Sequence, residues 1–184
     1  MCDPQQDRPA WEKLVGLGES SEGGGFYAFE SALHVFSTQR AQEWNAPELW
    51  RDGFANLEPD WWFFAEDVFA DQFFRAPTGE VGVFRAEEGE AEMLAPDLEA
   101  WAELILGDFE VWTGYPLAHE WQEEHGRLAE GERLTPKIPF VVGGGYELGN
   151  LYAASAVEIM AFRASFAAQV ESLSDGTEIR LTFE

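Results

Sequence analysis

Cysteine and basic residues are scarce in this 184-residue chain. Cys2 is the only cysteine, so no disulfide can form within the chain and no cysteine-based zinc site is available. The only lysines are Lys13 and Lys137, and 11 basic side chains stand against 35 acidic ones, for a formal net charge of -24. Such a field repels phosphate backbones and anionic lipid, so we expect no nucleic acid and no membrane surface among its partners.

Long apolar runs are also missing. No stretch approaches the roughly 20 apolar residues that span a bilayer. The first residues, Met1 to Pro4, form no basic segment followed by an apolar one, so no signal peptide is expected. A single cysteine is typical of a reducing compartment. These features together predict a cytoplasmic protein.

The chain is nevertheless rich in material for a core. Hydrophobic residues make up 46% of it and aromatic residues 15%, which disordered chains do not show. At this length one domain buries about 70% of the surface that the unfolded chain exposes. Residues 1–25 are poorly patterned apart from a short amphipathic stretch, Trp11 to Leu17. We expect residues 26–184 to form a single domain.

Short apolar runs separated by turn signals predict an antiparallel meander in the first half of the domain. The expected strands cover residues 26–29, 33–36, 61–64, 69–74, 81–86 and 91–94. Pro77-Thr78-Gly79 and Glu88-Gly89-Glu90 supply two of the hairpin turns. An apolar run at 139–142 is also typical of a strand.

Helical spacing of apolar residues marks several further segments. Asn45 before Pro47 indicates a helix start, with Leu49, Trp50 and Phe54 facing inward. Three helices are expected later, and a strand ends the chain. The first helix follows the N-cap Asp97, with Leu98, Trp101, Ala102 and Ile105 on one stripe, and the second is Pro116 to His125, with Leu117 and Trp121 inward and Gly126 after it. The third helix opens at Ser155 and places Ile159, Phe162, Phe166, Val170 and Leu173 on one face. The strand carries Ile179, Leu181 and Phe183.

These elements predict an α+β fold of one domain, with a mostly antiparallel sheet packed against helices. Trp101 and Phe162 are expected to be buried, because each lies on the apolar stripe of its helix.

The triple glycine Gly143-Gly144-Gly145 raises the possibility of a phosphate-binding loop. Such a loop needs Lys and Ser or Thr after its glycines. Here Tyr146 and Glu147 follow, and a carboxylate repels phosphate. A tight turn is therefore the favoured interpretation.

The three histidines, His34, His119 and His125, do not form a metal-binding pattern. Position 123 is Glu, so His119 lacks the second histidine that a zinc-binding helix places at i+4. His119 and His125 are six residues apart and face different sides of a helix. We predict no metal and no cofactor.

Glu66, Asp67 and Asp71 stand out because they interrupt an aromatic segment. Aromatic surroundings can raise the pKa of a carboxyl group for catalysis, which would suit a hydrolase with a carboxylate pair. The favoured alternative is that the three acids mark the solvent end of a hairpin or cap backbone donors. Local sequence supports no Ser-His-Asp or Cys-His arrangement, and we predict that the protein is not an enzyme.

The segment Trp61 to Phe74, WWFFAEDVFADQFF, resembles the SUKH superfamily of Smi/Knr-type fungal cell-wall regulators and bacterial immunity proteins. Residues 65–73 match its acid-containing turn, with Ala70 where glycine is usual. The hairpin 79–94 and the helix around Trp101 follow in the expected order. Segments 26–36, 44–47, 113–117 and 136–141 are similar to an uncharacterised bacterial branch of that superfamily.

The resemblance implies an α+β fold and a binding role without a general active site. It suggests an immunity-type protein that neutralises a basic toxin domain, such as a nuclease, in the producing bacterial cell. A scaffold or regulatory adaptor without a toxin is the alternative. The expected partner-binding carboxylates are Glu66, Asp67, Asp71, Glu87, Glu88, Glu90, Glu123 and Glu124. The acidic excess equally fits a role in solubility or a trait of the whole proteome.

Overall fold

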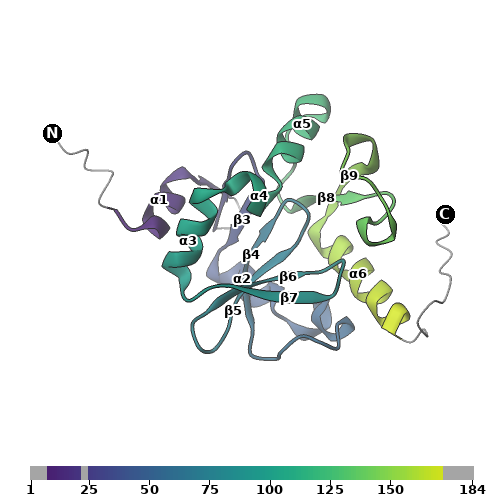
Figure 1. The fold of residues 1–184 in the computed structure, drawn as a ribbon, viewed down its shortest axis with the longest axis horizontal. Helices are drawn as coiled ribbons and strands as arrows, with labels where there is room; N and C mark the ends of the chain where they lie inside the picture. Colours follow the sequence, from purple (N-terminus) through teal and green to yellow (C-terminus); the bar gives the residue numbers. More distant parts are fainter. Residues whose placement is uncertain (1–7, 22–24, 172–184) are drawn as a thin grey trace.

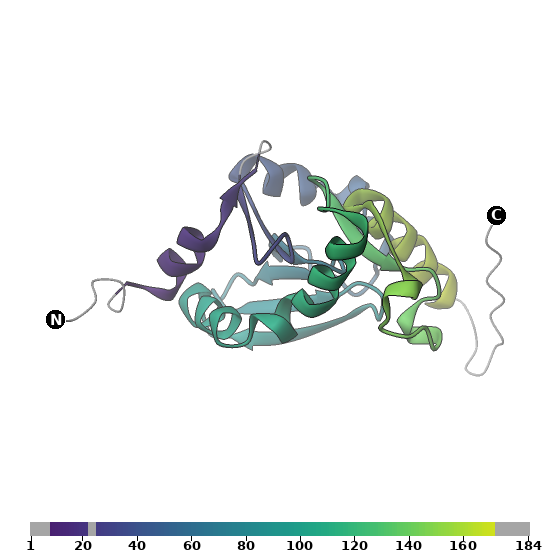
Figure 2. The same cartoon turned by 90° about the horizontal axis from the view of Figure 1, so that it is seen from above.

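Neighbouring side chains of the central strands enter two different hydrophobic layers, one on each face of a sheet. Phe73 and Val83 pack into one layer, whereas Phe74 and Phe84 pack into the other. This alternation follows from the period of two residues in a strand. Both faces must therefore be covered, and Figure 2 shows helices on either side of the sheet.

The computed structural model describes residues 8–21 and 25–171, the last four of them by their backbone alone. In these residues seven strands form an antiparallel sheet in sequence order (Figure 1). The strands are β1 (Glu19–Ser20), β2 (Gly25–Ala28), β3 (Leu33–Phe36), β4 (Trp62–Asp67), β5 (Gln72–Arg75), β6 (Val81–Arg85) and β7 (Glu90–Ala95). The predicted α+β fold of one domain with an antiparallel meander is confirmed.

Two groups of helices cover the sheet. On one face lie α1 (Ala10–Leu17) and α3 (Leu98–Gly107), and on the other α2 (Thr38–Trp44), η1 (Pro47–Leu49), η2 (Arg51–Gly53) and α6 (Ala156–Glu171). Asp97 caps α3 as predicted, with its side chain accepting a hydrogen bond from the Ala100 amide. The predicted stretch 11–17 is α1, and Glu99 accepts the amides of Ala10 and Trp11 at its start.

A third hydrophobic cluster lies beside the sheet. It joins α5 (Tyr115–His125) to a two-stranded antiparallel sheet of β8 (Glu132–Pro136) and β9 (Leu151–Ser155). Here α4 (Phe109–Thr113) leads into α5, and η3 (Phe140–Val142) and η4 (Leu148–Asn150) lie between the two strands. No helix in the described ranges is long and apolar enough to cross a membrane.

Two local predictions differ from the structure, and a third is not tested by it. The helix near Asn45 ends there instead of beginning: α2 runs from the N-cap Ser37 to Trp44, and only a 3-10 turn follows at Pro47. Trp50 and Phe54 are buried as expected. The apolar run 139–142 is a 3-10 helix and not a strand. The strand predicted at Ile179 to Phe183 lies outside the described residues.

The prediction that Phe162 is buried is wrong, because its side chain is 55% exposed. The stripe of α6 that faces the sheet runs instead through Ala156, Met160 and Ala164. A Cβ atom added to Gly53 would lie 2.5 Å from the Ala164 Cβ, so the helix approaches η2 too closely for a large side chain. The close approach of α6 to η2 therefore requires small residues on the buried face of the helix, whereas the sequence periodicity predicted large ones there.

Trp101→Ala should lower the free energy of unfolding by about 3–5 kcal/mol, the usual cost of truncating a buried large aromatic. Trp101 is fully buried and its ring meets those of Phe64 and Phe73. Phe162→Ala is the matched control and should cost less than about 1 kcal/mol, as surface changes do. Urea unfolding measures both, and equal losses would contradict this assignment of the core.

Candidate functional site

The turn between β4 and β5 gathers two of the predicted carboxylates at one end of the sheet. The Asp67 Oδ1 atom accepts the amides of Phe69 and Asp71, each at 2.9 Å. Within this turn Ala70 adopts a left-handed conformation at φ 62°. The Asp71 carboxylate accepts the Ala86 amide at 3.2 Å, which ties the turn to β6 and the residues after it. The expectation that these acids cap backbone donors is confirmed.

Glu66 is fully buried, so it does not lie at the solvent end of the hairpin. The prediction that it binds a partner is therefore wrong. Its carboxylate contacts three side chains: Arg133 Nε at 3.0 Å, His34 Nδ1 at 3.1 Å and Gln72 Nε2 at 3.3 Å. Burial acts to raise the pKa of Glu66, but the Arg133 charge and the His34 hydrogen bond lower it to about 2. Burial also lowers the pKa of His34.

The Glu66 network holds a turn of unusual conformation between β2 and β3. Phe29, Glu30 and Ser31 are all left-handed, with φ of 52°, 51° and 70°. Each such residue costs roughly 1–2 kcal/mol, so other contacts must hold the turn. Arg133 donates to the Ser31 carbonyl at 3.4 Å, and Gln122 of α5 donates to the Glu30 carbonyl at 2.7 Å. Glu66 therefore has a structural role.

Glu66→Gln should lower the free energy of unfolding by about 3 kcal/mol at pH 7, because it leaves the Arg133 charge buried without a counter-charge. A folded-state pKa below the ordinary 4.5 means that this stabilisation is present above pH 4.5 and is lost as pH falls toward 2.

The difference between wild type and Glu66→Gln in denaturant unfolding should therefore shrink between pH 4.5 and pH 2. Glu48→Gln, at an exposed site, is the matched control and should change stability little. A pH-independent difference would contradict the buried ion pair.

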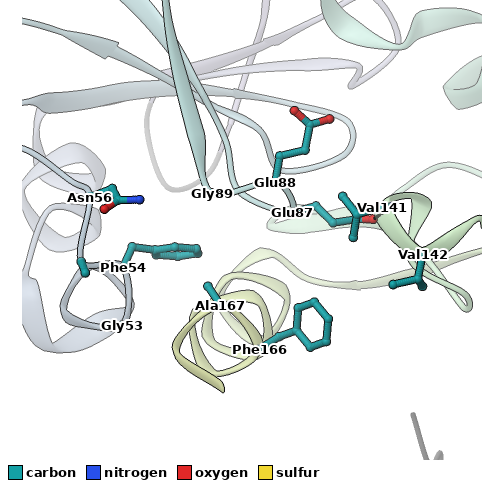
Figure 3. Close-up of a pocket in the computed structure, with 11 residues that line it drawn as sticks. Gly53, Phe54, Asn56, Glu87, Glu88, Gly89, Val141, Val142, Phe166 and Ala167 are labelled. Atoms are coloured by element: carbon teal, nitrogen blue, oxygen red, sulfur yellow. Dashed lines mark hydrogen bonds between the residues drawn. The ribbon is translucent and has the colours of Figure 1, made fainter. Parts of the chain in front are cut away.

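A groove of about 480 Å³ opens between the β6–β7 turn, the 3-10 helix η3, residues 53–56 and α6 (Figure 3). Most of its lining is apolar, with contributions from Phe54, Val141, Val142, Phe166 and Ala167. Val141 and Val142 are 45% and 46% exposed. Glu87 and Glu88 provide the acidic part of the rim. This apolar and acidic groove is the candidate binding site.

A smaller recess of about 40 Å³ shares Glu87, Glu88 and Val141 with the groove. Asp71 and Arg163 also line it. Its aromatic wall consists of Phe140 and Tyr146, whose rings stack with centroids 3.8 Å apart, and of Phe69, which meets both rings edge-on. Groove and recess thus adjoin and differ in polarity.

Arg163 anchors the acids of the recess from α6. It is 5% exposed, donates to the Phe69 carbonyl at 2.7 Å, and lies 3.5 Å from Glu87 and 3.9 Å from Asp71. Burial raises the pKa of Asp71 to about 6, against the lowering effect of Arg163. Burial and the Asp71 charge likewise raise the pKa of Asp67 well above its ordinary value. Arg163 and Arg85 lower the pKa of Asp71 but do not offset the effect of its burial.

Asp71→Asn should remove a pH dependence of stability. Because the folded-state pKa of Asp71 is raised from 3.8 to about 6, the folded protein binds the proton more tightly. That contribution is fully present below pH 3.8 and is lost as pH rises through 6. Asparagine can still accept the Ala86 amide.

The Tm of wild type, measured relative to that of Asp71→Asn, should therefore fall between pH 4 and pH 7. Using the difference cancels the titration of other groups, such as His34. A constant difference in Tm across this range would show that the pKa of Asp71 is not raised in the folded protein.

The remaining predicted acids are spread over the surface. Glu90 lies exposed on β7, and Glu123 and Glu124 lie exposed on α5, where they line neither the groove nor the recess. Asp67 is 8% exposed and so offers little surface to a partner. Of the eight predicted residues, the structure brings Asp71, Glu87 and Glu88 together in one site.

The remaining histidines and the triple glycine have structural contacts. His119 pairs with Glu30 at 2.7 Å, and His125 Nδ1 lies 3.0 Å from the Trp121 carbonyl. In residues 8–21 and 25–171 no three potential ligands cluster as a metal site would require. The turn predicted at 143–145 is confirmed: Gly143 has φ +98°, and the amides of Gly143 and Gly144 donate to the carbonyls of Phe140 and Pro139.

Sequence reasoning missed Arg163 and the apolar wall of the groove. Arg163 carried one usable signal, since a basic residue among apolar neighbours on a helix is unusual in a chain with so few cations. The sequence predicts a strand at Val141 and Val142 and a core position for Phe166. Their exposure depends on how η3 and α6 pack, which no local pattern reveals.

No family model and no curated protein matches this chain. Among solved structures it is similar to the crystal structure of Atu4351 from Agrobacterium tumefaciens, with a TM-score of 0.58 and 14% sequence identity. The match covers 78% of this chain and 71% of that one. At this identity the similarity concerns the fold alone.

Proposed function

We propose that the protein is a non-enzymatic binding module that holds a basic protein partner in the groove between the β6–β7 turn and α6. The observation that carries the proposal is the combination of exposed apolar walls with an acidic rim. Contiguous exposed apolar surface edged by polar groups is typical of protein interaction sites. A rim of carboxylates selects partners of opposite charge and speeds their encounter.

The partner class follows from charge and from the SUKH resemblance of residues 61–74. A net charge of -24 attracts basic proteins over a long range. We propose an immunity-type role in the cytoplasm of the producing bacterial cell, where the module neutralises a toxin domain such as a basic nuclease. A regulatory adaptor uses the same groove without a toxin, so the two roles differ in partner and not in site.

The hydrolase alternative finds less support in the geometry. Asp67 and Asp71 do form a carboxylate pair with raised pKa values. However, Asp67 Oδ1 accepts two turn amides, and the recess beside Asp71 holds only about 40 Å³. A substrate would need more room next to both acids.

Peptide display tests the binding role without a known partner. Random peptides selected on the immobilised protein should converge on a shared pattern and should compete for one site. Ala55→Trp fills the groove from an exposed position and should abolish their binding. A selection without convergence, or with binding unaffected by Ala55→Trp, would contradict the proposal.

Growth rescue tests the immunity role. A toxin domain encoded beside this chain's gene should stop growth of a bacterial host when expressed alone and should be tolerated when expressed with this chain. Loss of that protection in Ala55→Trp, with protein levels unchanged, would connect rescue to the groove. An adaptor would give no rescue.

Glu88→Lys should weaken binding of the selected peptides about tenfold, a difference of about 1.4 kcal/mol. Glu88 is exposed at the rim, so the substitution should leave the fold intact. Glu123→Lys makes the same charge change at an exposed position on α5 and should change affinity much less. Fluorescence anisotropy measures both, and equal losses would show that only overall charge matters.

A further inference from the structure

We infer that the segment entering the groove carries an arginine beside an apolar residue, with the apolar side chain between Phe54 and Phe166 and the guanidinium at the mouth of the recess. This inference rests on the proposed binding function and names the chemistry of the occupant. It follows from three features of the described residues: the charge of the recess, its aromatic wall and its continuity with the groove.

The recess is lined by more carboxylates than arginines. Asp71, Glu87 and Glu88 line it. Two arginines line it with these three acids: Arg163, and Arg85, which bonds Glu92 at 2.9 Å and is also attracted to Asp71 and Glu88. Arg163 is itself fixed by the Phe69 carbonyl. A second cation would therefore add to the cluster without displacing the first.

The acids differ in how freely they can receive that cation. Glu87 already accepts the Val141 amide at 3.0 Å and has a side chain only 11% exposed. Asp71 keeps 25% of its side chain exposed. Glu88 is exposed and has no hydrogen bond or ion pair with any residue the structure describes. Glu88 and Asp71 are therefore the main acceptors for an incoming donor.

The aromatic wall favours a guanidinium over a simple ammonium. Tyr146 is 64% exposed and stacks on Phe140, so part of its ring is accessible beside the acids. Burial and the charges of Asp71 and Glu87 raise the pKa of the Tyr146 phenol, so it stays neutral at pH 7. Guanidinium groups stack on aromatic rings and bind carboxylates with paired donors, and both contacts are available here.

The groove supplies the neighbouring apolar contact. It shares Glu87, Glu88 and Val141 with the recess, so one extended segment can place adjacent side chains in both. Figure 3 shows Phe54 and Phe166 on opposite sides of Ala167, with Glu88 above them and its carboxylate directed away from both rings. An apolar residue next to an arginine matches this order of surfaces.

Titration of the ¹⁵N-labelled full chain with N-acetylarginine amide tests the recess directly. We expect saturable shifts of the Ala86 and Val141 amides, which bond Asp71 and Glu87. N-acetylcitrulline amide has the same shape without the charge and should bind about tenfold more weakly, because it cannot form an ion pair with the carboxylates.

The double variant Asp71→Asn/Glu88→Gln should lose the preference for arginine over citrulline, whereas Glu124→Gln should keep it. Equal binding of the two amides by wild type, or shifts away from Ala86 and Val141, would overturn the inference. The display experiment separates the two proposals. Selected peptides that require the groove but lack a basic residue would support the binding function and would refute the inference that the occupant carries an arginine.

Discussion

A buried carboxylate, Glu66, connects most parts of this fold. It sits on β4 and contacts His34 of β3, Gln72 of β5 and Arg133 of β8. Gln72 in turn accepts the indole N–H of Trp44 at 2.7 Å, which brings in α2. A buried charge without partners costs several kcal/mol, so these contacts have to form together. The two-stranded sheet is thereby fixed against the large one.

Arg163 performs a similar task for α6. The main contacts of this helix with the sheet involve small and medium side chains, and its largest exposed residue, Phe162, faces away. Arg163 reaches the β4–β5 turn and the carboxylates of Asp71 and Glu87. Two of only 11 basic residues are thus buried against acids at the same end of the meander. In a chain this acidic, few cations remain for the other carboxylates.

That shortage connects the architecture to the proposed function. The acids nearest Arg163 outnumber it, and burial raises the pKa of Asp71 to about 6. A partner cation would relieve part of this strain and would stabilise the bound state. The groove beside the acids adds apolar area, which contributes about 25 cal/mol per Å² buried. In the proposed function, charge selects the partner, while apolar contact supplies affinity.

The meander and α3 could be predicted from the sequence, because strand alternation, turn residues and the Asp97 cap are local signals. The acidic charge and the lack of a cysteine or histidine metal pattern could be deduced from composition and spacing in the same way. Tertiary structure decided which carboxylates are available. Glu66 and Asp71 lie five residues apart in one acidic segment, yet Glu66 is enclosed by Arg133 and Asp71 borders an open recess. Arg133 pairs with Glu66 and Arg163 lies beside Asp71. Each arginine is more than 60 residues further along the chain than its acid, so no local pattern reveals the contact.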